Sequence, residues 1–244
     1  MIEDDLDACA TAAAVGAELN RLVPAVHAAA RPHGAPLLAP ARPYGGFLVD
    51  LRTVLLHGAV PLAVVRAVHR YYPSDVHAAI ASLVDGGWLS VDPGNGSVAA
   101  TDRCRALLTG LMAVLDGVCD SLWGTPSAVL STADALVAAG RGTSEGDAFD
   151  ALAAAGHPGA GTVAGRLFTA LCALRYHRAD AHAAAWAAEG LTADGVRSLA
   201  DEHPLRRRIE AATDRIAARP YRSLPAARQE FVAALHALPP LSAM

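Results

Sequence analysis

The sequence predicts a mainly α-helical protein with one small two-stranded β-hairpin. Apolar residues recur at the three- and four-residue spacing of a helix along most of the 244 positions. Strand-like segments flank a turn signal in one place, around Asp92-Pro93-Gly94-Asn95-Gly96. Glycine and proline breaks separate the helical segments. We expect three parts: an N-terminal helix and loop (1–46), a compact unit (47–124) and a helical C-terminal domain (125–244).

The first helix is predicted from residue 1 to about residue 30. Its apolar positions follow helical spacing at Ala8, Ala12, Val15, Leu19, Leu22 and Val26. Pro24 is a position at which the helix can kink. Residues 31–46 are rich in proline and glycine, so we expect a loop that packs on the surface or covers part of the fold.

Local sequence signals mark the helix ends in the central unit. Pro61 suits the first turn of a helix, Pro73-Ser74-Asp75 supplies an N-cap signal, and Thr101-Asp102 supplies another. Gly86-Gly87 ends the third helix. We therefore predict helices at 47–57, 61–72, 76–84 and 102–123, with strands at 88–91 and 97–100 before the last helix.

The C-terminal half carries only helical patterns. The predicted helices are 126–140, 145–155, 159–188, 192–200, 203–218 and 223–237. Breaks at His157-Pro158-Gly159 and at Gly190 separate neighbouring helices.

Composition argues against a nucleic-acid-binding protein. The formal net charge is −4 and the pI is about 6.2. Residues 71–102 contain no Arg and no Lys, while Asp75, Asp85, Asp92 and Asp102 are acidic. Affinity for DNA comes largely from basic side chains that neutralise phosphates. The central unit therefore lacks, over residues 71–102, the positive charge of a DNA-binding domain.

The central unit nevertheless resembles MarR-like winged-helix domains. The order of three helices, a two-stranded wing and a long helix is theirs, and "SLVDGGWLSV…GSVAATDRCRALL" matches them in detail. The resemblance implies a mainly α fold with a small β-wing, a helical C-terminal subdomain and a homodimer built from terminal helices. It also implies a ligand-responsive transcription regulator. We keep this function as an alternative because of the missing basic residues.

A second resemblance covers "LRYHRADAHAAAWAAEGLTADGVRSL". This segment is similar to a C-terminal stretch of actinobacterial helix-turn-helix proteins whose function is largely unassigned. Arg175, Arg178, Asp180 and His182 occupy the polar positions of that stretch. A fold-level likeness of this kind says little about chemistry.

The same segment holds the candidate site. Arg178 and His182 continue an apolar stripe of their helix, so we expect both to be partly buried. A buried arginine needs a carboxylate, carbonyls or an anionic ligand, and a histidine exchanges protons near neutral pH. We assign Arg178 and His182 a catalytic role. The substrate-binding candidates are Arg175, Tyr176, His177, Asp180 and Trp186.

Two other interpretations of this segment stay open. The first is a structural network of ion pairs between helices with a core histidine. The second is a metal site at His177, Asp180 and His182. The metal site is the weaker of the two, because His177 and His182 are five residues apart and lie on different faces. We expect no metal.

Several other features are interpreted as structural. The arginines at 206–228 fit a solvated helix face with pairs such as Arg206 with Glu210, although they are also where nucleic acid would bind. His69 and Tyr71, at the end of the predicted helix 61–72, are more typical of packing than of a pocket. The four cysteines have no zinc-ligand spacing, and no P-loop, G-x-S-x-G or H-E-x-x-H motif occurs. We expect no cofactor, no membrane span and a cytoplasmic location.

These observations favour a winged-helix protein repurposed to bind and transform an organic small molecule in specialised, antibiotic-type metabolism. The expected chemistry is cofactor-independent acid–base work: cyclisation, isomerisation or elimination. One alternative is the MarR-type regulator. The other is a protein that sequesters a small molecule without catalysis.

Overall fold

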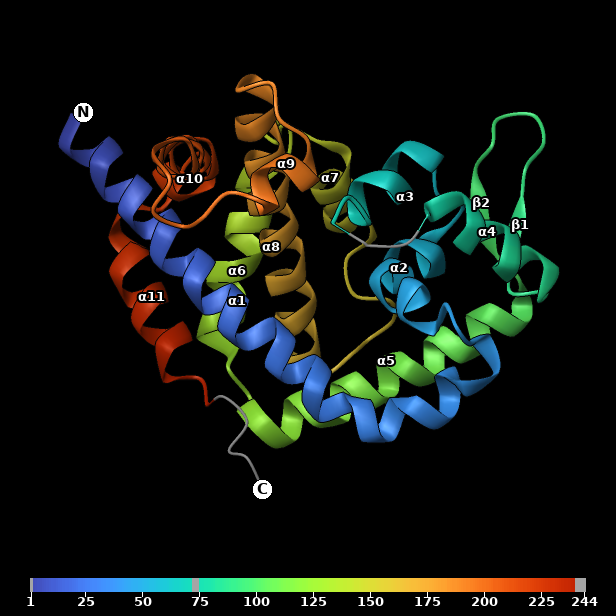
Figure 1. Cartoon of the computed structure of the whole chain (residues 1–244). Helices are drawn as coiled ribbons and strands as arrows, with labels where there is room; N and C mark the ends of the chain where they lie inside the picture. Colours follow the sequence, from blue (N-terminus) through green and yellow to red (C-terminus); the bar gives the residue numbers. More distant parts are fainter. Residues whose placement is uncertain (1, 72–74, 240–244) are drawn as a thin grey trace.

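The protein is mainly helical, with one antiparallel sheet of two strands (Figure 1). The computed structural model describes residues 2–71 and 75–239. Its helices are α1 (Ile2–Leu38), α2 (Gly45–His57), α3 (Leu62–Val68), α4 (Val76–Asp85), α5 (Asp102–Trp123), α6 (Ser127–Gly140), α7 (Asp147–Ala155), α8 (Val163–Ala188), α9 (Ala193–Arg197), α10 (Pro204–Ala217) and α11 (Arg228–Ala237). The strands are β1 (Leu89–Val91) and β2 (Val98–Ala100), and short 3-10 helices lie at Ala39–Ala41, Pro220–Ser223 and Pro225–Ala227.

Residues 45–108, which we call the head, follow the predicted order of elements. The Asp75 side chain caps α4 by accepting a hydrogen bond from the His77 N–H at 2.8 Å. Thr101 caps α5 in the same way. The hairpin pairs β1 with β2 antiparallel, in the register Leu89 with Ala100. Pro73 and Ser74, also part of the predicted cap signal, lie outside the described residues.

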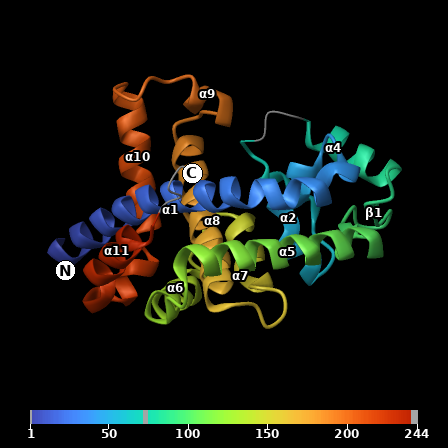
Figure 2. The same cartoon turned by 90° about the horizontal axis from the view of Figure 1, so that it is seen from below.

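α1 is longer than the sequence suggested. The loop predicted at 31–46 is instead helical as far as Leu38, although Pro24, Pro32 and Pro36 lie inside the helix. Each proline removes one backbone hydrogen bond from the helix. The buried stripe of α1 continues to Ala30, and the helix packs along α5 (Figure 2). Tertiary packing therefore outweighs the local cost of the prolines.

Three other helix boundaries differ from the prediction by four residues or more. α3 ends at Val68, before the expected end at residue 72. α8 begins at Val163 because Gly159 and Gly161 have φ angles of 76° and 50°, which a helix excludes. α11 begins at Arg228, after two short 3-10 helices in the segment predicted to be helical from 223.

Two large hydrophobic cores hold the structure together. One lies between α1, α5, α6, α8 and α11, with Leu115 and Phe168 among its fully buried side chains. The other fills the head and includes Phe149 of α7 and Ala173 of α8. α7 thus packs against α2, α3 and α8 and joins the head to the C-terminal helices.

α5 is, among the described residues, the one helix with the length and hydropathy of a membrane span. Its buried side chains contribute to both cores, for example Leu108 in the head and Leu115 beside α1. A core helix of a soluble protein has the same properties. The structure is therefore compatible with a soluble protein.

Candidate functional site

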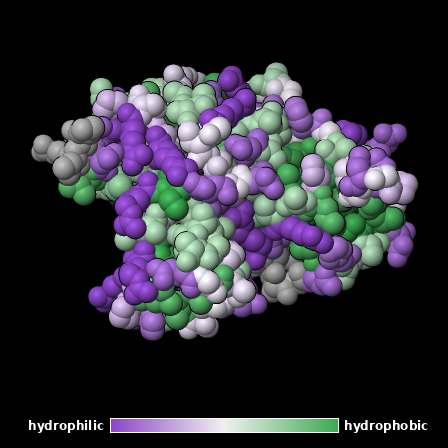
Figure 3. All heavy atoms as spheres, turned by 90° about the horizontal axis from the view of Figure 1, so that it is seen from above, coloured by the Kyte–Doolittle hydropathy of each residue, from purple (hydrophilic) through white to green (hydrophobic). Residues whose placement is uncertain are grey.

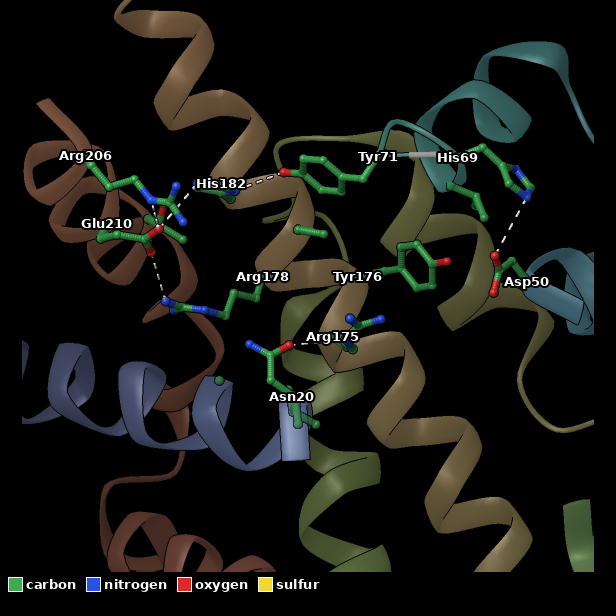
Figure 4. A pocket seen from close by; sticks show the side chains of 15 residues that line it. Asn20, Asp50, His69, Tyr71, Arg175, Tyr176, Arg178, His182, Arg206 and Glu210 are labelled. Atoms are coloured by element: carbon green, nitrogen blue, oxygen red, sulfur yellow. Dashed lines mark hydrogen bonds and ion pairs between the residues drawn. The ribbon is translucent and has the colours of Figure 1, made fainter. Parts of the chain in front are cut away.

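A pocket of about 450 Å³ lies where α8 faces α1, α10 and the end of α3 (Figure 4). Its lining combines charged, aromatic and small residues from five segments of the chain. The lining residues are Gly16, Leu19, Asn20, Asp50, Val68, His69, Tyr71, Arg175, Tyr176, Arg178, Ala179, His182, Arg206, Glu210 and Thr213. Four of the seven sequence candidates belong to this set: Arg175, Tyr176, Arg178 and His182.

α8 brings all four of these side chains to the pocket. Arg175, Arg178 and His182 follow one another at three- and four-residue spacing, so they lie on one helix face. The side chains of Arg178 and His182 are 22% and 19% exposed. The hydrophobic stripe of α8 therefore continues into partly buried polar groups.

Glu210 of α10 connects the polar groups on this wall. One carboxylate oxygen accepts a hydrogen bond from Arg206 Nε at 3.2 Å and lies 3.6 Å from His182 Nε2. The other oxygen is 3.6 Å from Arg178 Nη2. Glu210 thus balances the charges of Arg178 and Arg206, and it sets the environment of His182.

Arg178 has a second and closer partner on α10. Its Nη1 lies 2.6 Å from Asp214 Oδ1, within an ion pair in which the carboxylate is 25% exposed. Gly16 of α1 makes room for the guanidinium group, because a Cβ atom there would lie 2.6 Å from Arg178 Nε. Arg178 is therefore fixed by its own protein partners.

His182 is part of a hydrogen-bonded chain with two aromatic residues. Its Nδ1 lies 2.9 Å from the Tyr71 hydroxyl, which also accepts a hydrogen bond from Trp186 Nε1 at 3.4 Å. Burial lowers the pKa of His182, although Glu210 opposes this shift, and burial raises the pKa of Tyr71. Near neutral pH the imidazole is therefore neutral and the phenol keeps its proton.

A second acid–base pair lines the opposite end of the pocket. His69 Nε2 lies 3.9 Å from Asp50 Oδ2, and the imidazole stacks on Phe47 with ring centres 3.9 Å apart. The Asp50 side chain is 42% exposed, yet the surrounding protein raises its pKa, while burial lowers the pKa of His69. Both shifts favour the uncharged forms.

Arg175 differs from the other pocket arginines. Its Nε donates a hydrogen bond to the Asn20 amide oxygen at 3.3 Å, and the residue is exposed toward the pocket (Figure 4). Within the part of the chain that the structure describes, no carboxylate forms an ion pair with it. Its positive charge is therefore not neutralised by an ion pair, although it acts to lower the pKa of Asp50 in the same pocket.

Asp180 lies away from the pocket and has a structural environment. Its carboxylate forms an ion pair with Arg70 and accepts a hydrogen bond from the Phe149 N–H at 2.8 Å. Ser144 provides a further hydrogen bond, and the Asp180 side chain is fully buried. Asp180 thus ties α8 to α7 and to the turn after α3.

His177 and Trp186 also lie outside the pocket lining. The His177 ring is buried edge-on against Phe149, and burial lowers its pKa to about 4. Trp186 contacts the site through its hydrogen bond to Tyr71. Tyr176 does line the pocket, and Figure 4 shows its phenol oxygen pointing toward Asp50.

The arginines at 206–228 are mostly paired within the chain. The expected i,i+4 pair of Arg206 with Glu210 is present. Further ion pairs are Arg206 with Asp201, Arg208 with Glu189, Arg219 with Glu145, Arg222 with Asp5, and Arg228 with Asp4. Apart from Arg228, whose side chain is buried, these pairs support the interpretation as a solvated and ion-paired surface.

Sequence reasoning missed part of this site. Asp50 and Asn20 had no local pattern that pointed to a pocket, and His69 and Tyr71 were interpreted as packing residues. The one available signal was the four-residue spacing of two acidic residues, Glu210 and Asp214, which places both carboxylates on one face of α10. Among the described residues, no group of His, Cys, Asp or Glu has the arrangement of a metal site.

No family model, curated protein or solved structure matches this chain. The function must therefore be argued from the pocket itself.

Proposed function

We propose that the protein binds a small organic carboxylate in the pocket between α1, α8 and α10 and transforms it by cofactor-independent acid–base chemistry. The head is proposed to be a winged helix of the MarR-like kind that no longer reads DNA. The observation that carries this proposal is Arg175, a cation that faces the pocket without a carboxylate partner in the described protein.

Charge balance supports an anionic ligand. Arg178 and Arg206 are neutralised by Glu210 and Asp214. A carboxylate on Arg175 would form charge-assisted hydrogen bonds, which are among the stronger interactions available to a ligand. The neighbouring Asn20 amide would help to orient it.

The proton chemistry is assigned to Tyr71 and His182. Trp186 donates to the phenol oxygen, which leaves the phenol proton available to His182 Nδ1 or to a ligand. His182 Nε2 is buried and has no hydrogen-bond partner among the described residues; Glu210 lies just beyond reach at 3.6 Å. If the hydrogen-bonded pair of Tyr71 and His182 takes a proton from the ligand, the neutral imidazole of His182 is the group that accepts it. A small approach of Glu210 would then stabilise the positive charge on the imidazole.

The reaction class follows from these groups. A carboxylate held by Arg175, with a proton donor or acceptor nearby, suits proton abstraction next to a carbonyl, and hence isomerisation, elimination or cyclisation. The second pair, Asp50 and His69, faces the same pocket and offers a proton on the other side of the ligand.

A ligand screen followed by product analysis tests this chemistry. Thermal shift with a library of carboxylic acids identifies binders, and mass spectrometry follows each binder for a product. We expect His182→Ala and Tyr71→Phe to keep binding and to lower turnover by about a hundredfold, typical of a lost general acid–base group. Unchanged turnover in both variants would contradict the assignment, and binding without any product would indicate a sequestering protein.

The order of elements in the head favours one alternative, a MarR-type transcription regulator. Its helix α4 and its hairpin carry no Arg or Lys, so phosphate contacts would have to come mainly from elsewhere. A gel shift with the protein's own upstream DNA and with random duplex, at low and moderate salt, separates the two functions. Tight binding that weakens steeply with salt would establish the regulator. We expect no such binding.

A further inference from the structure

A second pocket, of about 500 Å³, lies beside the first half of α2. It is formed by the last turns of α1, the segment that leads into α2, and one face of α5. Asp50 is the single residue that it shares with the first pocket. The two pockets therefore meet at Asp50 and are otherwise lined by different residues.

The floor of the second pocket is hydrophobic. Leu38, Val49, Leu111 and Leu115 contribute side chains, and several glycine and alanine residues keep the space open. Pockets of about 300–1,000 Å³ with an apolar lining and few polar groups are typical of small-molecule sites. The floor suits the apolar body of a ligand.

Two arginines at the rim have no partner in the protein. Neither Arg31 nor Arg42 has a side-chain hydrogen bond or ion pair within residues 2–71 and 75–239, and both are exposed. Most arginines of the C-terminal helices are paired with carboxylates, as described above. Two unpaired guanidinium groups on one apolar pocket create an anion-binding rim.

A buried cation adds to the positive potential of this pocket. Arg52 of α2 is 4% exposed and forms no ion pair with a described residue. It donates a hydrogen bond at 2.7 Å to the carbonyl of Val49, which lines the pocket. Arg52 does not line the pocket itself, and it also attracts the Asp50 carboxylate, which does; its charge adds to the potential behind Val49 only at a distance.

We propose that the second pocket binds a small organic anion with an apolar ring system, whose sulfonate or carboxylate group is held by Arg31 and Arg42. This site is independent of the proposed function, because its residues differ from those of the first pocket except for Asp50.

Fluorescence titration of the full chain with 8-anilinonaphthalene-1-sulfonate tests the proposal. We expect saturable binding to the unaltered protein. Arg31→Gln/Arg42→Gln should weaken it by about tenfold, as expected for lost charge-assisted hydrogen bonds. The uncharged probe N-phenyl-1-naphthylamine should bind this double variant as before, because the apolar floor is unchanged.

Matched variants locate the binding. Arg207→Gln/Arg215→Gln removes two other exposed arginines and should leave sulfonate binding unchanged, as should Arg175→Gln in the first pocket. Gly46→Phe should abolish binding of both probes. Gly46 lines the second pocket, and a Cβ atom at this position meets no atom within 4 Å, so the phenyl ring has room to occupy the space of the ligand.

Three results would overturn the proposal: no saturable binding, equal affinity in the two double arginine variants, or loss of binding in Arg175→Gln. The arginine variants alter only surface side chains, so they decide the question even if Gly46→Phe does not fold. Loss of Arg175 tests the first pocket alone, so failure of one proposal is distinguishable from failure of the other.

Discussion

The head and the α8–α10 face of the molecule differ in where they place charge. The exposed residues of α4 are His77, Ala78, Ala81, Ser82, Val84 and Asp85, and Figure 3 shows hydrophobic residues on the surface of the head. The face between α8 and α10 instead gathers arginines, carboxylates and a histidine around a pocket. A head with the element order of a DNA-binding domain thus has neither Arg nor Lys on α4 or the hairpin, while charged groups converge on a pocket where a small ligand would fit.

The largest expected effect concerns Asp180, which is charged but lies outside the pocket. Asp180→Ala leaves Arg70 without its buried partner and the Phe149 N–H without an acceptor. We expect the free energy of unfolding, measured with urea, to fall by about 3 kcal/mol. Asp194→Ala is the control, since its ion pair with Arg197 is exposed, and it should change stability by about 0.5 kcal/mol or less.

Ligand binding by the same variant would show whether Asp180 stabilises the fold or belongs to the ligand site. The destabilised but folded Asp180→Ala protein should still bind carboxylate ligands with unchanged affinity. A variant of normal stability that fails to bind ligand would instead place Asp180 in the site.

A smaller effect is expected from the pH dependence of stability. Burial lowers the pKa of His177 to about 4, whereas the unfolded chain has an ordinary histidine. Folding therefore favours the neutral ring. The contribution of the neutral His177 ring to the free energy of unfolding is present above pH 6.5 and is lost as the pH falls toward 4. His177 should account for about 2 kcal/mol of lost stability between pH 7 and pH 5.

His177→Gln isolates this contribution. Urea unfolding at pH 7 and at pH 5 should show a smaller loss for the variant than for the unaltered protein. Equal losses would mean that His177 titrates normally and is not buried as the structure shows.

The smallest effect concerns the surface arginines. Arg208 pairs with Glu189, and its side chain is 60% exposed. Arg208→Gln should change the free energy of unfolding by about 0.5 kcal/mol or less and leave ligand affinity unchanged. A loss of more than about 2 kcal/mol would show that this surface is more than a solvated ion-paired face.

The sequence predicted most helices because their apolar spacing and their caps are local properties. Asp75, Thr101 and the glycines after α4 act within a few residues of the boundaries they set. The helix through Pro32 and Pro36 could not be predicted in this way, since the packing of α1 against α5 stabilises it.

The site shows the same limit. Arg175, Arg178 and His182 were found because they share one face of a single helix. Asp50 and Asn20 join them from α2 and α1, and no local pattern records that proximity. Conversely, His177 and Asp180 lie in the same polar segment of the sequence, but they are on the face of α8 that packs against α7.

The most direct test of the ligand site is the affinity of carboxylates for Arg175. Isothermal titration with hydroxybenzoates and their primary amides would compare the unaltered protein with Arg175→Gln and with the surface control Arg207→Gln. We predict that the carboxylates bind more tightly than the amides and that Arg175→Gln alone weakens them, by about tenfold or more. Equal binding of carboxylates and amides, or unchanged affinity in Arg175→Gln, would contradict the proposed site.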